Sequence, residues 1–223
     1  MGRFSVSVRM PPRPETLFFD LDNTLYPRRL GVVDRIDRRI NEYMRTRLRI
    51  DDSDVDSLRR RFWAEHGTTL RGLEFHHAVN PDEYLEYVHD IEITDLLKPD
   101  PALRTLLERL PGRKAVFSNA SRAHAARVLG LLDLEGVFAA VLGLEDLGYM
   151  PKPVDAAYRL VLSRFGATAA DSALIDDTRT NLAPAKRLGM RTFWVSDTAG
   201  DDGRDDWIDH VVASVHEIEA ILA

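Results

Sequence analysis

Residues 18–27, FFDLDNTLYP, place two aspartates, Asp20 and Asp22, directly after a short apolar run. A carboxylate beside apolar neighbours costs several kcal/mol unless a cation or good hydrogen bonds compensate it. The run from Thr16 to Phe19 is too short for a helix and suits a strand that is buried on both faces. We therefore expect a buried strand that delivers two acids to a site with a compensating positive charge.

The composition is that of an ordinary globular protein. The chain has 223 residues, of which 30% are charged and 44% hydrophobic, and its formal net charge is −6. This length allows one large domain, or one domain with a smaller insert, around a sizeable core. The excess of acid argues against a nucleic acid polymer as a partner, because neutralising phosphates calls for a basic face.

Cysteine usage and the N-terminal segment bear on the compartment. The absence of cysteine excludes disulfides, thiol catalysis and thiolate metal sites, and it fits a reducing cytoplasm. The N-terminal segment has no apolar core of a secretory signal, and no run approaches the roughly 18 apolar residues that span a bilayer. We expect a cytoplasmic monomer or homodimer with no membrane partner. Residues 1–14, rich in proline, are expected to be extended or poorly ordered.

Residues 28–97 have the periodicity of helices and little that suggests a strand. A second helix is expected from Ser53 to Gly67, and a third from Asn80, the N-cap, with Pro81 in its first turn. The apolar face of the first helix consists of Val33, Ile36, Ile40, Tyr43, Met44 and Leu48. The pattern predicts an insert of three helices, with Ser53 and Asp56 in a capping box.

Beyond Lys98 short apolar strands alternate with helices. The predicted strands are KAVFSN (114–119), AAVLG (139–143), SALIDD (172–177), TFWVSD (192–197) and HVVAS (210–214). Such alternation is typical of a parallel sheet that helices cover on both faces. We predict an α/β fold with a doubly wound, mostly parallel Rossmann-like sheet. Residues 15–27 and 98–223 would form its catalytic core, and residues 28–97 a helical cap inserted after the first strand.

Polar side chains gather at the carboxyl ends of these strands, where such sheets bind their ligands. In chain order they are Asp20, Asp22, Ser118, Asn119, Lys152, Asp176 and Asp177. Carboxylates that converge without histidine or cysteine form an all-oxygen pocket, and Mg²⁺ is the cation that prefers such a pocket while keeping several waters. A magnesium ion would compensate the buried acids and attract phosphate.

These residue types can carry out phosphoryl transfer. Asp20 can attack phosphorus as a covalent nucleophile. Asp22 can protonate the leaving alcohol and later deprotonate the attacking water. Ser118 and Lys152 can donate to the phosphoryl oxygens, and Asp177 can complete the metal site.

The four motifs resemble those of the haloacid dehalogenase-like hydrolase superfamily. DLDNT matches its DxDxT signature, Ser118 its second motif, Lys152 its third, and the pair Asp176-Asp177 its fourth. The resemblance covers the chain from Phe18 to Val195, with all motifs in the expected order and each at a predicted strand end or in the following loop.

The resemblance implies a role for each matching residue. It makes Asp20 the nucleophile and Asp22 the acid and base, with Mg²⁺ held by the Asp20 carboxylate, the Asp22 backbone carbonyl and Asp177. Its phosphate-binding or nucleophile-holding residues are Thr24, Ser118, Asn119 and Lys152, and its supporting residues are Asp176 and Asn181. Carbon-halide hydrolases of the superfamily lack the second aspartate, so Asp22 argues for phosphoryl transfer.

A finer resemblance concerns the leaving group. The segments LRGL (70–73) and LLKPDPALRTLLERLPGRKAVFSNA (96–120) look like the pyrimidine 5′-nucleotidase branch, whose members carry a helical cap. The cap would act as a lid that excludes water and recognises the leaving group. We expect Arg71, His76 and Tyr84 to contact the substrate. A metal site at His76-His77 is not expected, because adjacent helical residues point apart and no further histidine stands at ligand spacing.

Structural explanations exist for each motif on its own. Asp20 and Asp22 could form a capping turn, the pair Ser118-Asn119 could be an N-cap, Lys152 could lie in a surface turn, and Asp176-Asp177 could cap the next helix.

The main functional hypothesis is a Mg²⁺-dependent phosphomonoester hydrolase that acts through an aspartyl-phosphate on a small metabolite, a pyrimidine nucleoside 5′-monophosphate first. Alternatives are a phosphatase of phosphoglycolate or a sugar phosphate, a phosphomutase, and a non-catalytic binding module. An oxidoreductase is disfavoured because the first turn contains no GxGxxG.

Overall fold

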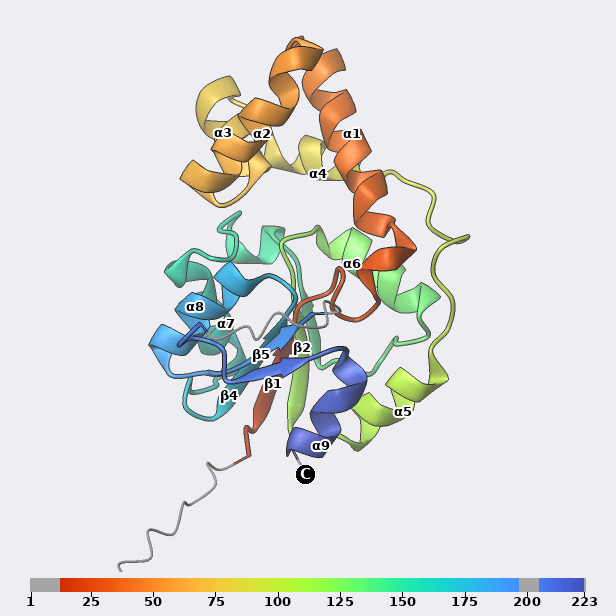
Figure 1. The fold of residues 1–223 in the computed structure, drawn as a ribbon, viewed down its shortest axis with the longest axis vertical. Helices are drawn as coiled ribbons and strands as arrows, with labels where there is room; N and C mark the ends of the chain where they lie inside the picture. The colour runs from red at the N-terminus through yellow and green to blue at the C-terminus, as the bar shows by residue number, and fades with distance from the viewer. Residues whose placement is uncertain (1–12, 197–204, 223) are drawn as a thin grey trace, which may run out of the picture.

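The computed structural model of the protein describes residues 13–196 and 205–222, so most of the predicted lead-in, residues 1–12, lies outside the described residues. A 6-stranded, fully parallel sheet has the strand order β3-β2-β1-β4-β5-β6. The predicted α/β fold is confirmed (Figure 1). The strands are β1 Thr16–Phe19, β2 Arg113–Phe117, β3 Ala140–Leu142, β4 Ser172–Asp176, β5 Arg191–Val195 and β6 His210–Val212.

Strand β1 lies in the middle of the sheet and is buried along its whole length. It pairs with β2 on one side and with β4 on the other, so that Phe19 stands between Val116 and Ile175. Strand order reverses at β1, and in such sheets the ligand crevice lies outside the carboxyl ends at the reversal point. The aspartates that follow β1 therefore lie where an α/β sheet binds its ligand.

Helices cover both faces of the sheet (Figure 1). Leu17 and Phe19 pack with α5 (Pro101–Arg109), α6 (Arg122–Leu131) and α9 (Ile218–Leu222). Phe18 points to the opposite face and packs with α7 (Asp155–Phe165) and α8 (Arg179–Leu188). Alternate side chains of the strand thus supply two separate cores, as the period of a strand requires.

Four further helices lie together at one end of the molecule, beyond the carboxyl ends of the strands (Figure 1). They are α1 (Val32–Thr46), α2 (Asp52–His66), α3 (Thr69–His77) and α4 (Pro81–His89). The expectation of three helices is wrong, because residues 69–77 form a helix of their own. Its signal is Thr68, whose side chain accepts a hydrogen bond from the Arg71 backbone N–H as an N-cap.

One predicted helix boundary also differs from the structure. Helix α2 starts at Asp52 after Asp51, so the proposed Ser53–Asp56 capping box does not form its N-terminus. Helix α8 starts at Arg179, after Thr178. Three 3₁₀ turns span Arg28–Leu30, Glu145–Leu147 and Val215–Glu217, and the last of them leads into α9. None of the described helices is long and apolar enough to cross a membrane.

Gly72 sets how closely α3 approaches α2. A Cβ at this position would lie 2.2 Å from Cγ of the fully buried Phe62. We expect Gly72→Ala to lower the free energy of unfolding by about 1–3 kcal/mol, because the packed ring must move. Thermal and denaturant unfolding measure the change. Gly130→Ala, in helix α6, is the control. Its Cβ would meet only the carboxylate of Glu135, at 3.4 Å, so we expect the free energy of unfolding to stay unchanged or to rise. An unchanged melting temperature of Gly72→Ala would contradict the packing argument.

Candidate active site

Three carboxylates meet at the carboxyl ends of the two central strands. Asp20 follows β1, Asp176 ends β4, and Asp177 comes next. Each offers an oxygen within 4.8 Å of the others. We expected these acids to lie together because the carboxyl ends of adjacent parallel strands lie on the same side of the sheet. The structure brings all three together.

Lys152 neutralises part of this charge. Its Nζ donates to Asp20 Oδ1 and to Asp176 Oδ2, each at 2.7 Å, and its side chain is fully buried. Burial opposes the charged amine, but Asp176 and Asp20 outweigh it and raise the pKa of Lys152 above its usual value. Asn119 holds the lysine loop, because its side chain donates to the Lys152 carbonyl at 2.9 Å and accepts from the Lys152 N–H at 2.8 Å.

Asp20 is buried and held by two donors. Besides Lys152, the Thr24 hydroxyl donates to Asp20 Oδ2 at 3.1 Å. The same hydroxyl oxygen accepts the Asp177 backbone N–H at 3.1 Å, so Thr24 joins the two strand ends. Burial raises the pKa of Asp20 well above its ordinary value, and Asp176 and Asp177 add to the shift against the opposing effect of Lys152. One lysine thus lies among three carboxylates in a buried cluster.

The two carboxylates of the pair Asp176-Asp177 differ in their hydrogen bonds: that of Asp176 accepts several, whereas that of Asp177 accepts few. Asp176 accepts from Lys152, from the Thr178 backbone N–H at 2.8 Å, and from Asn181 Nδ2 at 3.0 and 3.1 Å. Asp177 is partly exposed and accepts the Thr178 hydroxyl at 3.2 Å. Burial and the neighbouring Asp176 raise the pKa of Asp177 to about 6. Asp177 is thus the member with capacity for a further cation.

The donor set fits Mg²⁺. The cluster offers hard carboxylate oxygens alone as ligands, and its three carboxylates face one lysine. Beside it, Asn23 adopts a left-handed backbone conformation at φ 61°, and its side-chain oxygen is buried with no partner among the described residues. Such an oxygen can hydrogen-bond a metal-bound water.

Asp22 turns its carboxylate away from this cluster. Its Oδ1 accepts hydrogen bonds from His124 Nε2 at 3.0 Å and from the Tyr26 hydroxyl. Burial opposes the charge of Asp22, but His124 and Tyr26 outweigh it and hold the pKa of Asp22 below its ordinary value. Neither partner was predicted from the sequence. His124 stands 102 residues away on helix α6, and no spacing rule connects it to Asp22.

Ser118 and Asn119 follow β2 at the same edge. Ser118 is buried, and its oxygen accepts the Ala120 backbone N–H at 2.9 Å, which leaves the hydroxyl hydrogen free to donate. The four predicted motifs therefore lie around one point, although they come from separate parts of the chain.

A pocket of about 310 Å³ opens beside this point, between the carboxyl ends of the strands and helices α1 to α4. From the sheet edge it is lined by Asp20, Asp22, Asn23, Ser118, Asn119, Ala120, Leu144, Asp177, Thr178 and Asn181. From the helical side it is lined by Val33, Ile36, Asp37, Ile40, Arg59, Trp63, Thr68, Thr69, Leu70, Tyr84, Leu85, Val88 and His89. Of the three predicted substrate-contact residues, Tyr84 lines this pocket, whereas Arg71 and His76 do not.

His76 lies on the exposed outer side of the α2–α3 pair instead. Its Nε2 is 3.4 Å from that of His66, and Glu65 brings a carboxylate near both. The expectation that no further histidine stands at ligand spacing is wrong, because helix packing joins two histidines that are 10 residues apart. Arg71 is also exposed and lies 3.6 Å from Glu74.

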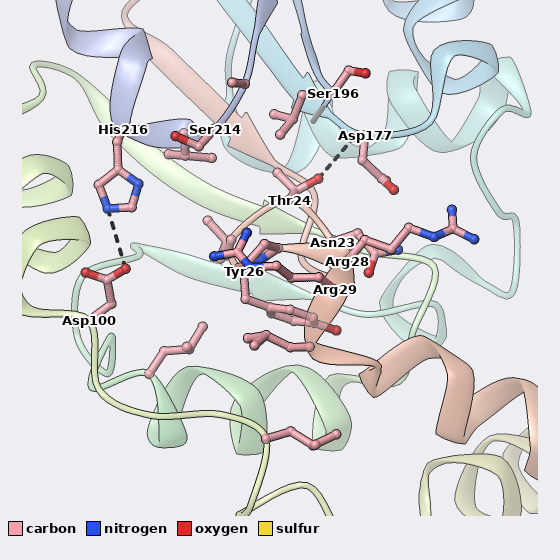
Figure 2. A pocket seen from close by; sticks show the side chains of 18 of the residues that line it. Asn23, Thr24, Tyr26, Arg28, Arg29, Asp100, Asp177, Ser196, Ser214 and His216 are labelled. Atoms are coloured by element: carbon pink, nitrogen blue, oxygen red, sulfur yellow. Dashed lines mark hydrogen bonds and ion pairs between the residues drawn. The ribbon is translucent and has the colours of Figure 1, made fainter. Parts of the chain in front are cut away.

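A larger cavity of about 870 Å³ lies on the other side of the turn after β1 (Figure 2). Its wall includes Arg28, Arg29 and the pair His216 and Asp100, whose side chains are 3.4 Å apart. It shares Thr24 and Asp177 with the acidic site but contains none of Asp20, Asp22 and Ser118, all of which line the smaller pocket. The chemistry of the four motifs therefore belongs to the smaller pocket.

Comparison with protein families identifies residues 14–189 as matching a haloacid dehalogenase-like hydrolase. Among curated proteins, Phosphate metabolism protein 8 of Saccharomyces cerevisiae is 26% identical over 196 residues. The match covers 80% of this chain and 60% of that protein, so the chain spans less than two thirds of its relative.

Solved structures share the fold. The magnesium-bound HAD-hydrolase YfnB from Bacillus subtilis superposes with a TM-score of 0.64 at 15% identity, covering 95% of this chain and 99% of the other. A HAD phosphatase from Thermococcus onnurineus superposes with a TM-score of 0.62 at 17% identity, covering 94% and 98%. At these identities the superpositions show a shared fold and nothing finer.

Proposed function

The chain belongs to the haloacid dehalogenase-like hydrolases, and from this membership we propose that it is a Mg²⁺-dependent phosphomonoester hydrolase that forms an aspartyl-phosphate on Asp20. The observation that carries the proposal is the position of Asp20. Its carboxylate is held by Lys152 and Thr24, at the switch point of the sheet, beside two further acids and an open pocket. The name of the yeast relative, Phosphate metabolism protein 8, agrees with phosphate chemistry.

In the first step the Asp20 carboxylate attacks phosphorus, the ester bond breaks, and the alcohol leaves with a proton from Asp22. In the second step water attacks the phosphorus of the aspartyl-phosphate, Asp22 accepts its proton, and the bond between phosphorus and Asp20 breaks, which releases inorganic phosphate and restores the Asp20 carboxylate. Lys152 and Thr24 fix the direction of the Asp20 carboxylate. The free hydroxyl hydrogen of Ser118 donates to a phosphoryl oxygen.

Asp22 must be protonated in one step and ionised in the next. Its hydrogen bonds favour the ionised form in the resting protein, which is the form that accepts a proton from water. An anionic phosphoester beside it raises its pKa, since a neighbouring like charge disfavours ionisation. The bound substrate thus supports the acid role, and transfer of the proton to the departing alcohol leaves Asp22 ionised as the base.

The cation and the supporting residues have separate tasks. Mg²⁺, when bound, would be held by the Asp20 and Asp177 carboxylates and the Asp22 carbonyl, and would neutralise charge on the phosphoryl oxygens. Asp176 and Asn181 keep Lys152 and the following loop in place. Asn119 fixes the backbone of the lysine loop.

The helices at residues 28–97 form the cap in this proposal and select the leaving group. The cap side of the pocket is largely apolar and carries two aromatic residues, Trp63 and Tyr84. Trp63 is 52% exposed, which is unusual for tryptophan and leaves a ring face for a substrate. A nucleoside with a planar base fits such a wall, so we propose a pyrimidine nucleoside 5′-monophosphate as the first substrate to test.

A panel of phosphomonoesters tests the proposal. It contains pyrimidine and purine nucleoside monophosphates, sugar phosphates, phosphoglycolate and p-nitrophenyl phosphate, each with Mg²⁺ and with chelator. We expect phosphate release that depends on Mg²⁺, with UMP or CMP ahead. Release from other esters alone would reject the nucleotidase and keep the phosphatase. No release from any ester would reject the hydrolase and favour a mutase or a binding module.

A further inference from the structure

His124 is built into the core as a donor to Asp22. Its side chain has no exposed surface, and its Nε2 lies 3.0 Å from Asp22 Oδ1. The other ring nitrogen, Nδ1, is buried with no partner among the described residues. A proton on Nδ1 would be a buried donor without an acceptor, whereas an unprotonated nitrogen costs less. The geometry therefore assigns the proton to Nε2, which donates it to the Asp22 carboxylate.

The hydrogen bonds distinguish the two oxygens of Asp22. Both His124 and Tyr26 donate to Oδ1. No residue in the described ranges donates to Oδ2. Two donors on one oxygen fix the rotation of the carboxylate and leave the other oxygen available to exchange a proton with a substrate in the pocket that Asp22 lines. Acid and base catalysis depends on this placement before it depends on pKa.

A second histidine joins His124 to the helical cap. His89, at the end of α4, stacks on the His124 ring with centroids 4.5 Å apart and planes at 23°. The Ser121 hydroxyl lies 3.1 Å from His89 Nδ1 and also accepts the His124 backbone N–H, as the N-cap of α6. Burial, with His124 next to it, lowers the pKa of His89 to about 3, so a neutral ring covers His124.

We propose that His124 is a positioning residue that holds the Asp22 carboxylate in the orientation for proton transfer to the leaving group, and that His89 of the cap keeps His124 in place. This proposal rests on the proposed function and deepens it. It connects the helical insert to acid and base catalysis through two stacked rings, so that the cap contributes to the chemical step as well as to substrate recognition.

The test compares two leaving groups in the full-length protein with Mg²⁺. An alkyl ester such as glycerol phosphate needs a proton on its departing oxygen, whereas p-nitrophenolate leaves without one. The ratio kcat/KM covers the steps up to departure of the leaving group, so it reports the acid role. For His124→Leu we expect kcat/KM for glycerol phosphate to fall about 10–100-fold and that for p-nitrophenyl phosphate to fall less than about threefold.

Two further variants separate positioning from packing. His124→Gln places an amide N–H near the position of Nε2, and we expect it to recover most of the activity toward the alkyl ester. It also keeps the test valid if His124→Leu fails to fold. His210→Leu is the matched control, because His210 is also a stacked histidine, 4.7 Å from the Phe193 ring, on the distant strand β6. We expect His210→Leu to leave the ratio of kcat/KM for glycerol phosphate to kcat/KM for p-nitrophenyl phosphate unchanged.

His89 is tested in two backgrounds. His89→Ala should lower kcat/KM for glycerol phosphate about threefold to tenfold in the otherwise native protein and have no further effect in the His124→Leu variant, because both act through one contact. Equal losses for both esters, or additive effects of the two substitutions, would overturn the positioning proposal while the hydrolase stands. A native protein that releases phosphate from neither ester would overturn the proposed function, and this proposal with it.

Discussion

Replacing Asp20 with asparagine is expected to reduce phosphate release about a thousandfold or more, because the amide cannot attack phosphorus and no other described carboxylate takes its place. Asp176 is engaged by Lys152, Thr178 and Asn181. Asp22 is turned toward His124. Phosphate release with Mg²⁺ measures the loss, and a variant that keeps more than a few per cent of the activity would reject Asp20 as the nucleophile.

The same substitution should not cost stability when divalent cations are removed. The folded-state pKa of Asp20 is raised, chiefly by burial, so its ionised form is disfavoured in the folded protein at any pH above the unfolded pKa of about 4. At neutral pH asparagine removes this cost. We expect a melting temperature in chelator equal to or above that of the native protein.

Asp171→Asn is the matched control for both measurements. Asp171 lies directly before the amino end of β4, at the opposite end of the strand from the site, and the Thr168 hydroxyl donates to it at 2.6 Å. We expect its activity to remain near the native level, because it is far from the strand ends that form the site. A lower melting temperature of Asp20→Asn in chelator would mean that the carboxylate stabilises the fold, contrary to the direction of its pKa.

The sheet and the main parts of the site were predictable because they depend on local patterns. A four-residue buried run must be a strand, and parallel strands end at a common edge, so Asp20, Ser118 and the Asp176-Asp177 pair had to converge. The order of motifs along the chain sufficed to assign them. None of these inferences required knowledge of how the helices of residues 28–97 pack.

The missed features arise from packing. Helix α3 is only 9 residues long and contains Gly72, so its periodicity is weak, and it exists because Gly72 fits against Phe62. The contact of His124 with Asp22 joins a helix face to a turn that is remote in sequence. Arg71 and His76 were predicted as substrate contacts because they lie in the predicted cap, and a place in the cap sequence does not specify which side of a helix faces the pocket.

Lys152→Met is expected to be the most destabilising substitution in the site. Lys152 is buried between Asp20 and Asp176, at 2.7 Å from each. Removing one partner of a buried ion pair leaves an uncompensated charge and typically costs about 3–5 kcal/mol. We expect a loss of this size at neutral pH in chelator, together with loss of phosphate release, because Asp20 is no longer held.

The dependence on pH and Mg²⁺ identifies the cause of that loss. Without the lysine, ionised carboxylates in the cluster cost folding free energy, so their folded pKa values rise further and the deficit grows as pH rises through the unfolded pKa of about 4. The difference in the free energy of unfolding between Lys152→Met and the native protein should therefore shrink toward acidic pH, where the acids are protonated. It should also shrink when Mg²⁺ is added, because a bound cation supplies the missing positive charge.

Lys114→Met separates this electrostatic effect from the loss of any buried lysine. Lys114 on β2 is also buried, but its Nζ donates to the backbone carbonyls of Leu110 and Gly112, at 2.7 and 3.0 Å, and to no carboxylate. Lys114→Met should lower the free energy of unfolding less than Lys152→Met does. We expect this loss to change neither when Mg²⁺ is added nor when the pH is made acidic. If both variants lost the same stability with the same response to Mg²⁺, the charge balance at Asp20 and Asp176 would not be the function of Lys152. If only Lys152→Met responded, the lysine and the cation would share one task, the neutralisation of a carboxylate cluster that the fold needs for its chemistry.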